Sequence, residues 1–454
     1  MTDSEQRQNH YQTRKKRVIA EAQALVAAGY KLALGKKTSN LFRNRKSSGP
    51  KIDVSDLNHV LRVDAENLIV EVEGMTPFAT LVTETLKYGC LPTVVPELKS
   101  ITVGGALTGV AIESSSFRYG LVHETIVESE ILLSDGSVII CTADNEHRDL
   151  FFSFPNTYGS LGYALKVKMR LIRVKPFVKL THIHFNSAKD LFAKMNEICL
   201  ANRTQGSIAY VDAMALDETN LHLTLGEFVD TAPYVSNYKF MKMYYRSIAG
   251  RDEDYLSASD YIWRWDTDWF WCSKNFGMQY PWLRFLVGKW LLTSVSYWKV
   301  MRFARNSKMV GLLEKWFSNP KETVIQDIEV PVENAETFHH FFHQKIKIKP
   351  VWMCPVRTLN HEAKYHFYPL DHAKLFVNFG FWEAIESDQE PGYYNRLIET
   401  EVSRLAGHKS LYSDVYYTEQ QFWQFYDKAH YQQIKAKYDP KGGLREWYQK
   451  VTGK

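Results

Sequence analysis

The sequence predicts an α+β protein of two domains. Between 51 and 173, short β-rich runs alternate with turn residues, and Ser134-Asp135-Gly136 is typical of a hairpin turn. After Lys175-Pro176 the pattern changes to a new set of strand-like runs with an intervening helix. The chain contains no unit of strand, Gly-x-Gly-x-x-Gly and helix, so we expect no Rossmann domain for FAD or for a nicotinamide cofactor.

The N-terminal part supplies the elements of the first domain. A lead-in helix is expected within 1–30, because apolar residues recur at helical spacing over 14–29. In the first domain, 31–176, a second helix is expected over 76–88, where Pro77 stands in the first turn. The expected strands of this domain are 52–54, 68–72, 129–133, 138–141 and 163–172.

The second domain is expected over 177–420, and a C-terminal helix within 421–454 follows it. The expected elements of the second domain are strands 179–185, 209–211, 221–225 and 321–331 and helices 190–201 and 335–345. His339 and His343 on the last helix have the spacing of zinc ligands. An exposed helix face is favoured, because no third ligand and no Glu at the catalytic spacing accompany them.

Residues 255–318 form an aromatic and basic insert in the second domain. Eight of the twelve tryptophans lie there, at Trp263, Trp265, Trp269, Trp271, Trp282, Trp290, Trp298 and Trp316. Indole rings interleaved with Lys and Arg are typical of a membrane-water interface, where the cations meet anionic lipid. They are equally typical of an aromatic lid on a substrate domain, and both interpretations stay open.

The composition indicates a folded protein of the cytoplasm. The 454 residues are 45% hydrophobic and 24% charged, and the net charge of +5 is small and mixed in sign, so we expect no nucleic-acid partner. The five cysteines form no C-x-x-C pair, which predicts neither a zinc site nor a redox dithiol and fits a reducing compartment. The polar N-terminus lacks a signal peptide, and the best apolar run, 285–300, is interrupted by Lys289. We expect a cytoplasmic protein, either in solution or at a membrane surface.

The stretch 96–120 has the composition of a ligand-binding loop. Its glycines alternate with small hydroxyl residues, and almost no side chain between Ile101 and Ser116 is both bulky and polar. Glycine permits close approach of the backbone, so N–H groups and hydroxyls there can meet a pyrophosphate. The alternative from the residues alone is a packed glycine-rich turn.

At these residues the sequence resembles the FAD-linked Δ24-sterol reductase family, within the vanillyl-alcohol oxidase superfamily. The resemblance rests on Thr102-Val-Gly-Gly, Gly109-Val-Ala-Ile-Glu-Ser-Ser-Ser, Tyr119-Gly-Leu, Val174-Lys-Pro-Phe-Val-Lys-Leu, Ile325-Gln-Asp-Ile-Glu-Val-Pro, Val351-Trp-Met-Cys-Pro and Leu411-Tyr-Ser-Asp-Val-Tyr. It implies a PCMH-type FAD-binding domain over 31–176, a substrate (cap) domain over 177–420, and a C-terminal helix that returns to the FAD domain. Eukaryotic members of the family have an N-terminal membrane anchor, which we do not expect here.

The resemblance also implies the cofactors. FAD is expected to bind without a covalent bond, because the segment 35–40 has no histidine, and Lys36 or Lys37 is a candidate for a charge on the phosphate. NADPH is the expected electron donor. The residues expected to bind FAD are Thr102, Val103, Gly104, Gly105, Gly109, Ile112, Glu113, Ser114, Ser115, Tyr119, Gly120, Gly159 and Gly162.

The implied reaction is reduction of a carbon-carbon double bond in a lipid, either sterol-like, isoprenoid or methylene-branched acyl. An acid must protonate the carbon that receives no hydride. The candidates are Tyr412, Asp414 and Tyr416, with Arg357 and His366 as less favoured residues. Two other functions stay open: an oxidase or dehydrogenase of an alcohol, sugar or hydroxy acid on the same fold, and a non-catalytic lipid-binding protein on a flavin scaffold.

Overall fold

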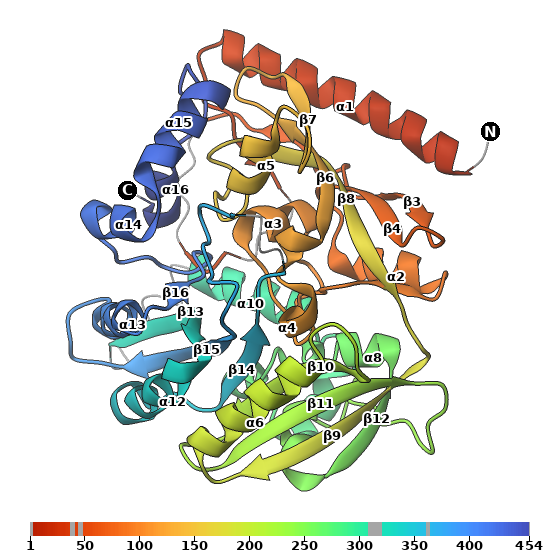
Figure 1. The fold of residues 1–454 in the computed structure, drawn as a ribbon, viewed down its shortest axis with the longest axis vertical. Helices are drawn as coiled ribbons and strands as arrows, with labels where there is room; N and C mark the ends of the chain where they lie inside the picture. The colour runs from red at the N-terminus through yellow and green to blue at the C-terminus, as the bar shows by residue number, and fades with distance from the viewer. Residues whose placement is uncertain (1–2, 37–40, 44–48, 307–319, 360–363, 454) are drawn as a thin grey trace.

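The first sheet forms the upper half of the molecule in Figure 1, a computed structural model that describes residues 3–36, 41–43, 49–306, 320–359 and 364–453. Its strands run antiparallel and lie in the spatial order β3 (Val60–Asp64), β4 (Ile69–Glu73), β8 (Tyr163–Arg173), β6 (Ile126–Leu132) and β7 (Val138–Thr142). The short strand β5 (Cys90–Pro92) pairs with the end of β8. A separate parallel pair joins β1 (Leu34–Gly35) to β2 (Ile52–Asp53).

The helices of this half cover both faces of the sheet. The long helix α1 (Asp3–Ala27) extends beyond the expected 14–29 and crosses the top of the molecule (Figure 1). It lies on the charged face, where Tyr11 donates a hydrogen bond to Glu130 and Arg14 pairs with Glu73 at 2.6 Å. The other helices are α2 (Phe78–Leu86), α3 (Val103–Gly109), α4 (Ser116–Tyr119), η1 (Val122–Thr125) and α5 (Arg148–Ser153).

The glycine-rich stretch is a helix where the sequence suggested a loop. Thr102 caps the N-terminus of α3, because its hydroxyl accepts a hydrogen bond from the Gly105 N–H at 3.3 Å. A Cβ at Gly104 would lie 2.8 Å from the carbonyl oxygen of Gly74, so the missing side chain allows α3 to pack directly on the chain after β4. A helix cap and close packing therefore outweigh the low helix propensity of glycine.

The second sheet forms the lower half of the molecule, and the chain passes to it between the end of β8 and the start of β9. All pairings are antiparallel. The eight strands lie in the order β12 (Glu253–Ser257), β9 (Phe177–Phe185), β11 (Leu221–Val229), β10 (Ile208–Ala215), β14 (Val351–Val356), β15 (Phe376–Glu386), β13 (Lys321–Pro331) and β16 (His408–Lys409).

The two faces of this sheet have different partners. Three helices, α6 (Ala188–Ala201), α12 (Val332–Phe341) and α13 (Tyr393–Arg404), pack on one face, and α12 continues into a π-helical turn, η5 (Phe342–Ile346). Along β14, Val351 and Met353 face these helices, whereas Trp352 and Cys354 join the core shared with the first domain. This period of two makes the opposite face of the sheet one wall of the space between the domains.

The aromatic insert divides into a buried part and an exposed part. Trp265, Trp269 and Trp271 are buried between the domains, whereas Trp282 and Trp290 are 63% and 82% exposed. Trp316, Lys308 and Lys315 lie outside the described residues. The helices of this region are α7 (Tyr244–Ser247), η2 (Ile248–Gly250), α8 (Ala258–Ile262), η3 (Asp266–Asp268), η4 (Cys272–Phe276), α9 (Pro281–Val287) and α10 (Ser294–Asn306).

Three helices follow the second sheet where the sequence suggested one, namely α14 (Glu419–Phe425), α15 (Lys428–Tyr438) and α16 (Trp447–Thr452). The break comes at Asp427, whose carboxylate caps α15 by accepting from the His430 N–H at 2.9 Å. These helices lie beside α5 in Figure 1, and Lys435 and Lys450 donate to the carbonyl oxygens of Ser160 and Gly159. The end of the chain thus packs on the first domain.

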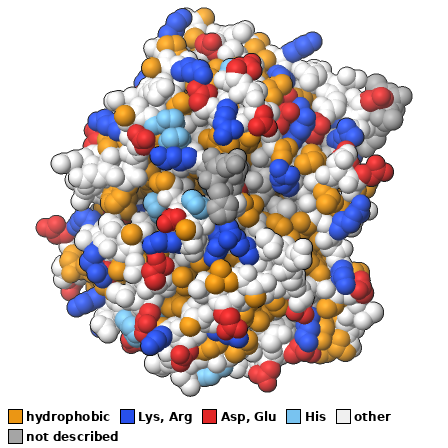
Figure 2. Space-filling view, viewed as in Figure 1, with side chains coloured by type: hydrophobic (Ala, Val, Ile, Leu, Met, Phe, Trp, Pro, Cys, Tyr) orange, Lys and Arg blue, Asp and Glu red, His pale blue; other side chains and the backbone are white. Residues whose placement is uncertain are grey.

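Positive and negative side chains are interspersed over the face shown in Figure 2, so that face has no large region of one sign. Among the helices described here, none is both long and apolar enough to cross a bilayer.

Candidate functional site

A cavity lies between the two domains, with an empty volume of about 1320 Å³ including its open mouth. One wall comes from 96–113 in the first domain, and the facing wall from β13, β14 and β15. Trp269 and Phe270 of the insert also line it, and we call these two residues the lid.

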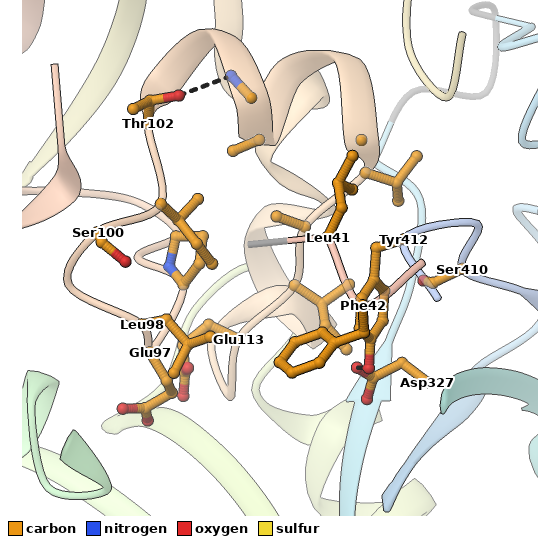
Figure 3. A pocket seen from close by; sticks show the side chains of 18 of the residues that line it. Leu41, Phe42, Glu97, Leu98, Ser100, Thr102, Glu113, Asp327, Ser410 and Tyr412 are labelled. Atoms are coloured by element: carbon orange, nitrogen blue, oxygen red, sulfur yellow. Dashed lines mark hydrogen bonds between the residues drawn. The ribbon is translucent and has the colours of Figure 1, made fainter. Parts of the chain in front are cut away.

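The described side chains of the wall are mostly apolar, and the charged ones stand at separate places. Figure 3 shows Glu97 and Glu113 at one end of the cavity, Asp327 and Tyr412 at the other, and Phe42 between them. The one described cation of the wall is Lys36. Neighbouring Lys37 lies outside the described residues.

Asp327 and Tyr412 form the centre of a hydrogen-bond network. The Tyr412 hydroxyl donates to Asp327 Oδ2 at 2.8 Å and accepts from the Trp382 indole N–H at 3.0 Å. The Asn378 amide donates to the other oxygen of Asp327 at 2.9 Å. Enclosure away from bulk water raises the pKa of Asp327 to about 6, and burial beside that carboxylate raises the pKa of Tyr412 well above its ordinary value.

A second carboxylate, Glu329, lies two residues along the same strand and accepts a hydrogen bond from Tyr368. Its burial raises its pKa to about 8. In β13, Val324 and Ile328 face the helices, so Asp327 and Glu329 belong to the opposite, cavity-side set of residues. A proton held near neutral pH at two neighbouring carboxyl groups suits acid-base chemistry.

Comparison with known proteins identifies the cofactor domain. A family model described as an FAD binding domain matches residues 14–142, which contain α3 and most of the first sheet. Delta(24)-sterol reductase of Homo sapiens is 26% identical over 410 residues, covering 87% of this chain and 76% of the human protein. Delta(24)-sterol reductase of Arabidopsis thaliana is 24% identical over 491 residues, covering 98% of this chain and 85% of the plant protein.

The chain is similar to the Delta(24)-sterol reductases over most of its length and contains an FAD binding domain. It is an FAD-dependent oxidoreductase with the α+β fold of the PCMH-type FAD-binding proteins and a second domain. A shorter match is to cytokinin dehydrogenase 7 of Oryza sativa subsp. japonica, which is 24% identical over 169 residues, covering 37% of this chain and 31% of that protein.

The cavity wall fits FAD at the residues that the family motif supplies. Of the thirteen residues expected to bind FAD, five line the cavity: Thr102, Gly105, Gly109, Ile112 and Glu113. The two glycines keep the wall free of side chains, since a Cβ at Gly105 would lie 2.9 Å from the Thr102 hydroxyl. The hydroxyls of Ser100 and Thr102 and the Lys36 ammonium would hold the phosphates, and the rings of Phe42 and Tyr158 offer apolar surfaces to the flavin.

The other eight residues support this wall without lining the cavity. The backbone N–H groups of Val103 and Gly104 do not point to a ligand, because they donate to the carbonyl oxygens of Thr76 and Gly74 at 3.0 and 2.8 Å. The Ser114 hydroxyl donates to Glu113, and the Ser115 hydroxyl donates to the carbonyl of Thr93. These two backbone N–H groups, which we expected to be free for a ligand, therefore attach α3 to the chain that follows β4.

The remaining four residues shape the turns around the wall. Tyr119 ends α4 and packs partly buried on the core, and Gly120 follows it with a φ of +70°. Gly159, also at positive φ, accepts a hydrogen bond from Lys450, and a Cβ at Gly162 would lie 2.5 Å from the Ile131 side chain. These glycines serve backbone conformation and packing.

Of the three candidate acids, Tyr412 alone lines the cavity. The Asp414 carbonyl accepts from Lys409, and the Tyr416 ring lies 5.7 Å from the Arg396 guanidinium on α13. The two less favoured residues also lie elsewhere. The backbone N–H of Arg357 donates to Ser116, and the His366 ring stacks on His430 at 3.6 Å. The segment that carries the three candidates is irregular apart from a single bridge at Ser413, so the strand period of two, which would turn all three side chains to one face, does not apply.

The sequence analysis did not predict Asp327 or Glu97 as site residues. Asp327 lies within a motif that carries the family resemblance, and Glu97 lies five residues before another. A usable signal was present for Asp327, because a carboxylate that stands between apolar residues of a predicted strand needs a partner or a function if it is buried. The sequence held no equivalent signal for Glu97, whose partner Arg264 is far away in the chain.

Glu97 and Glu113 belong to a buried cluster around Arg264. The guanidinium lies 2.6 Å from Glu97, 3.0 Å from Glu113 and 2.8 Å from Asp212, and its side chain is fully buried. Trp352 donates its indole N–H to Asp212 at 3.1 Å. Burial, opposed only in part by Arg264, raises the pKa of Glu97 well above its ordinary value. One cation thus joins the FAD-side wall to the second sheet.

Replacing Gly105 with valine should lower the affinity for FAD. The new side chain would crowd Thr102 and enter the cavity, and overpacking typically costs about 1–3 kcal/mol, or roughly 5- to 150-fold in binding. Titration of the apo-protein with FAD, followed by flavin fluorescence, measures the change. Gly250→Val is the matched control, because a Cβ there meets nothing within 4 Å. Equal FAD affinity in the two variants would show that the cofactor does not use this wall.

Proposed function

We propose that the protein reduces a carbon-carbon double bond of a lipid, with FAD as the bound cofactor and NADPH as the electron donor. The observation that supports this most directly is the Tyr412-Asp327 pair, which places a hydroxyl proton and a carboxyl group at the wall of an apolar cavity. The names of the relatives, Delta(24)-sterol reductase, point to the same reaction class. When bound, FAD supplies hydride transfer from the nicotinamide to one alkene carbon.

The protein's own residues supply the proton and exclude water. Tyr412 donates its hydroxyl proton to the second alkene carbon, and Asp327, when protonated, restores it through their hydrogen bond. The reaction then adds one hydride and one proton across the double bond and converts NADPH to NADP⁺. Phe42, Trp269 and Phe270 cover the cavity with aromatic surface, which favours a hydrocarbon over water or a sugar.

The substrate class follows from the same wall. Most of its described side chains are apolar, and Figure 3 shows its labelled acidic side chains at the two ends of the cavity with Phe42 between them. A sterol-like or isoprenoid chain, or a methylene-branched acyl chain, meets that description. The five cysteines are all buried and unpaired, which supports the proposal that the protein works in the reducing cytoplasm, at the surface of the membrane that holds its substrate.

The visible spectrum of the purified protein under anaerobic conditions tests this function. We expect NADPH to bleach the flavin absorbance, and an unsaturated lipid to restore it while the saturated lipid does not. A flavin that NADPH leaves unchanged but an alcohol, sugar or hydroxy acid bleaches would replace the proposal with an oxidase or dehydrogenase. A protein that cannot be reconstituted with FAD would instead support the non-catalytic lipid-binding alternative.

The rate of lipid reduction should fall as the pH rises through about 6, the pKa of Asp327. Below this pH the protonated carboxyl can donate to the Tyr412 oxygen and leave the hydroxyl proton for the substrate. Above it the carboxylate accepts that proton, as the 2.8 Å hydrogen bond shows, so each further pH unit lowers the rate about tenfold.

The pH profile of kcat for reoxidation of the flavin by lipid measures this step. Asp327→Asn keeps the hydrogen bond and cannot titrate, so its profile should lose the inflection near pH 6. An unchanged inflection in this variant would assign the titration to another group, with Glu97 as the next candidate.

A further inference from the structure

Six large apolar side chains lie exposed within twelve residues at and beyond α9, and we call them the α9 patch. They are Tyr280, Trp282, Phe285, Leu286, Trp290 and Leu291, and they are between 58% and 82% exposed. A monomeric protein seldom exposes so many neighbouring aromatic and aliphatic side chains unless the surface binds something.

The polarity of α9 is the reverse of that of an ordinary surface helix. Arg284, its one charged residue, is fully buried and forms an ion pair with Asp268 at 2.6 Å. Trp282, Phe285 and Leu286 point to the solvent instead. The buried ion pair holds the helix in this orientation, so the exposure of the apolar face is built into the fold.

The charge around the patch is of one sign. The sequence has no Asp or Glu from 269 to 313, and it has seven Lys or Arg in that span. Of those that the structure describes, Lys289 and Lys299 are exposed and form no ion pair, and Lys289 lies 5.0 Å from the centre of the Trp290 ring. Indoles at headgroup depth flanked by cations are the surface chemistry that binds an anionic bilayer.

We propose that the α9 patch docks on the surface of an anionic lipid bilayer. Aromatic side chains enter the interface between headgroups and acyl chains, and Lys289 and Lys299 contact the phosphates of acidic lipids. The complete lack of acidic residues in the span argues against a basic protein partner.

The patch is continuous with the lid of the cavity. Asp268, which holds Arg284, directly precedes Trp269 and Phe270 of the lid, and Trp298 on α10 contacts Phe42 edge to face at 4.8 Å. A protein docked by α9 would therefore bring its lid to the bilayer. This inference deepens the proposed function by naming the source of the lipid, but docking itself requires no reaction.

Sedimentation with vesicles tests the docking with the full holo-protein. The vesicles are phosphatidylcholine alone, or phosphatidylcholine with about one third phosphatidylglycerol, and neither NADPH nor substrate is added. We expect the protein to sediment with the anionic vesicles and to remain in the supernatant with the neutral ones. The triple variant Trp282→Ser, Phe285→Ser, Trp290→Ser should bind at least tenfold more weakly, with its flavin absorbance and melting temperature unchanged.

Two further variants separate the contributions. Lys289→Glu and Lys299→Glu should each weaken binding to the anionic vesicles about fivefold or more. Tyr88→Ser removes an exposed aromatic ring just after α2 and should bind like the parent. A triple variant that binds as tightly as the parent would overturn the proposal.

Analytical ultracentrifugation without lipid tests the alternative that a second copy of this chain binds the α9 patch. A parent protein that is dimeric and a triple variant that is monomeric would make the patch a contact between two copies, and would also overturn the proposal. Because vesicle binding is measured without turnover, a protein that docks but does not reduce lipids would refute the proposed function and leave the docking surface standing.

Discussion

Replacing Tyr412 with phenylalanine is expected to lower the rate of lipid double-bond reduction by about 10²- to 10⁴-fold, the contribution typical of a positioned general acid. The substitution keeps the ring, which contacts Phe42 at 5.8 Å between centroids, and removes only the hydroxyl. The affinity for FAD and the rate of flavin reduction by NADPH should not change, because neither step needs this proton. The defect should appear in the oxidative half-reaction alone.

Stopped-flow measurement of the two half-reactions checks this expectation. NADPH reduces the flavin in the first, and the unsaturated lipid reoxidises it in the second. Tyr393→Phe is the matched control, because that tyrosine lies exposed on α13, away from the cavity. A Tyr412→Phe variant that reoxidises at the parent rate would remove Tyr412 as the acid.

Replacing Arg264 with methionine should destabilise the folded protein by about 3–5 kcal/mol, the usual cost of breaking a buried ion pair. The guanidinium is the shared partner of Glu97, Glu113 and Asp212, and its loss leaves buried carboxylates without a counter-charge. The contact of Arg264 with the Tyr261 ring, 4.2 Å from the guanidinium carbon to the ring centroid, is lost as well.

Urea unfolding followed by tryptophan fluorescence and flavin release measures this loss. The control is Arg62→Met, which breaks an exposed pair with Asp64 and should cost at most about 1 kcal/mol. The deficit of Arg264→Met should shrink as the pH falls toward about 4, because the uncompensated carboxyl groups then become neutral in the folded and the unfolded state alike. Equal stability of the two variants would show that the buried cluster holds little of the fold together.

Local patterns predicted much of the fold and the class of the cofactor. Apolar periodicity and turn residues predicted α2, β4, β7 and β8 to within a few residues of their observed bounds. They also predicted the second half of α1, which begins earlier, at Asp3. The glycine-rich stretch was recognisable because its residues are consecutive in the chain. Its helical form was not predictable from propensity, because the cap at Thr102 and the contact between Gly104 and Gly74 are what stabilise α3.

The division of the aromatic insert into a buried and an exposed part could not be predicted from sequence periodicity. Trp269 and Trp282 both lie in the insert, yet Trp269 lines the cavity and Trp282 faces the solvent. The difference depends on the Asp268-Arg284 ion pair, which turns the charged side of α9 inward. The buried part of the insert thus lines the cavity, whereas contact of its exposed part with a membrane is a proposal.

The sequence by itself determined that this chain has two α+β domains, a glycine-rich wall and an FAD-binding motif, because such features are encoded by neighbouring residues. The tertiary structure alone decided which groups meet at the cavity. Asp327 reaches Tyr412 across 85 positions, and Glu113 reaches Arg264 across 151. Residues so far apart in the sequence meet only because β-strands pair and the two domains pack together, and no local sequence pattern indicates such contacts.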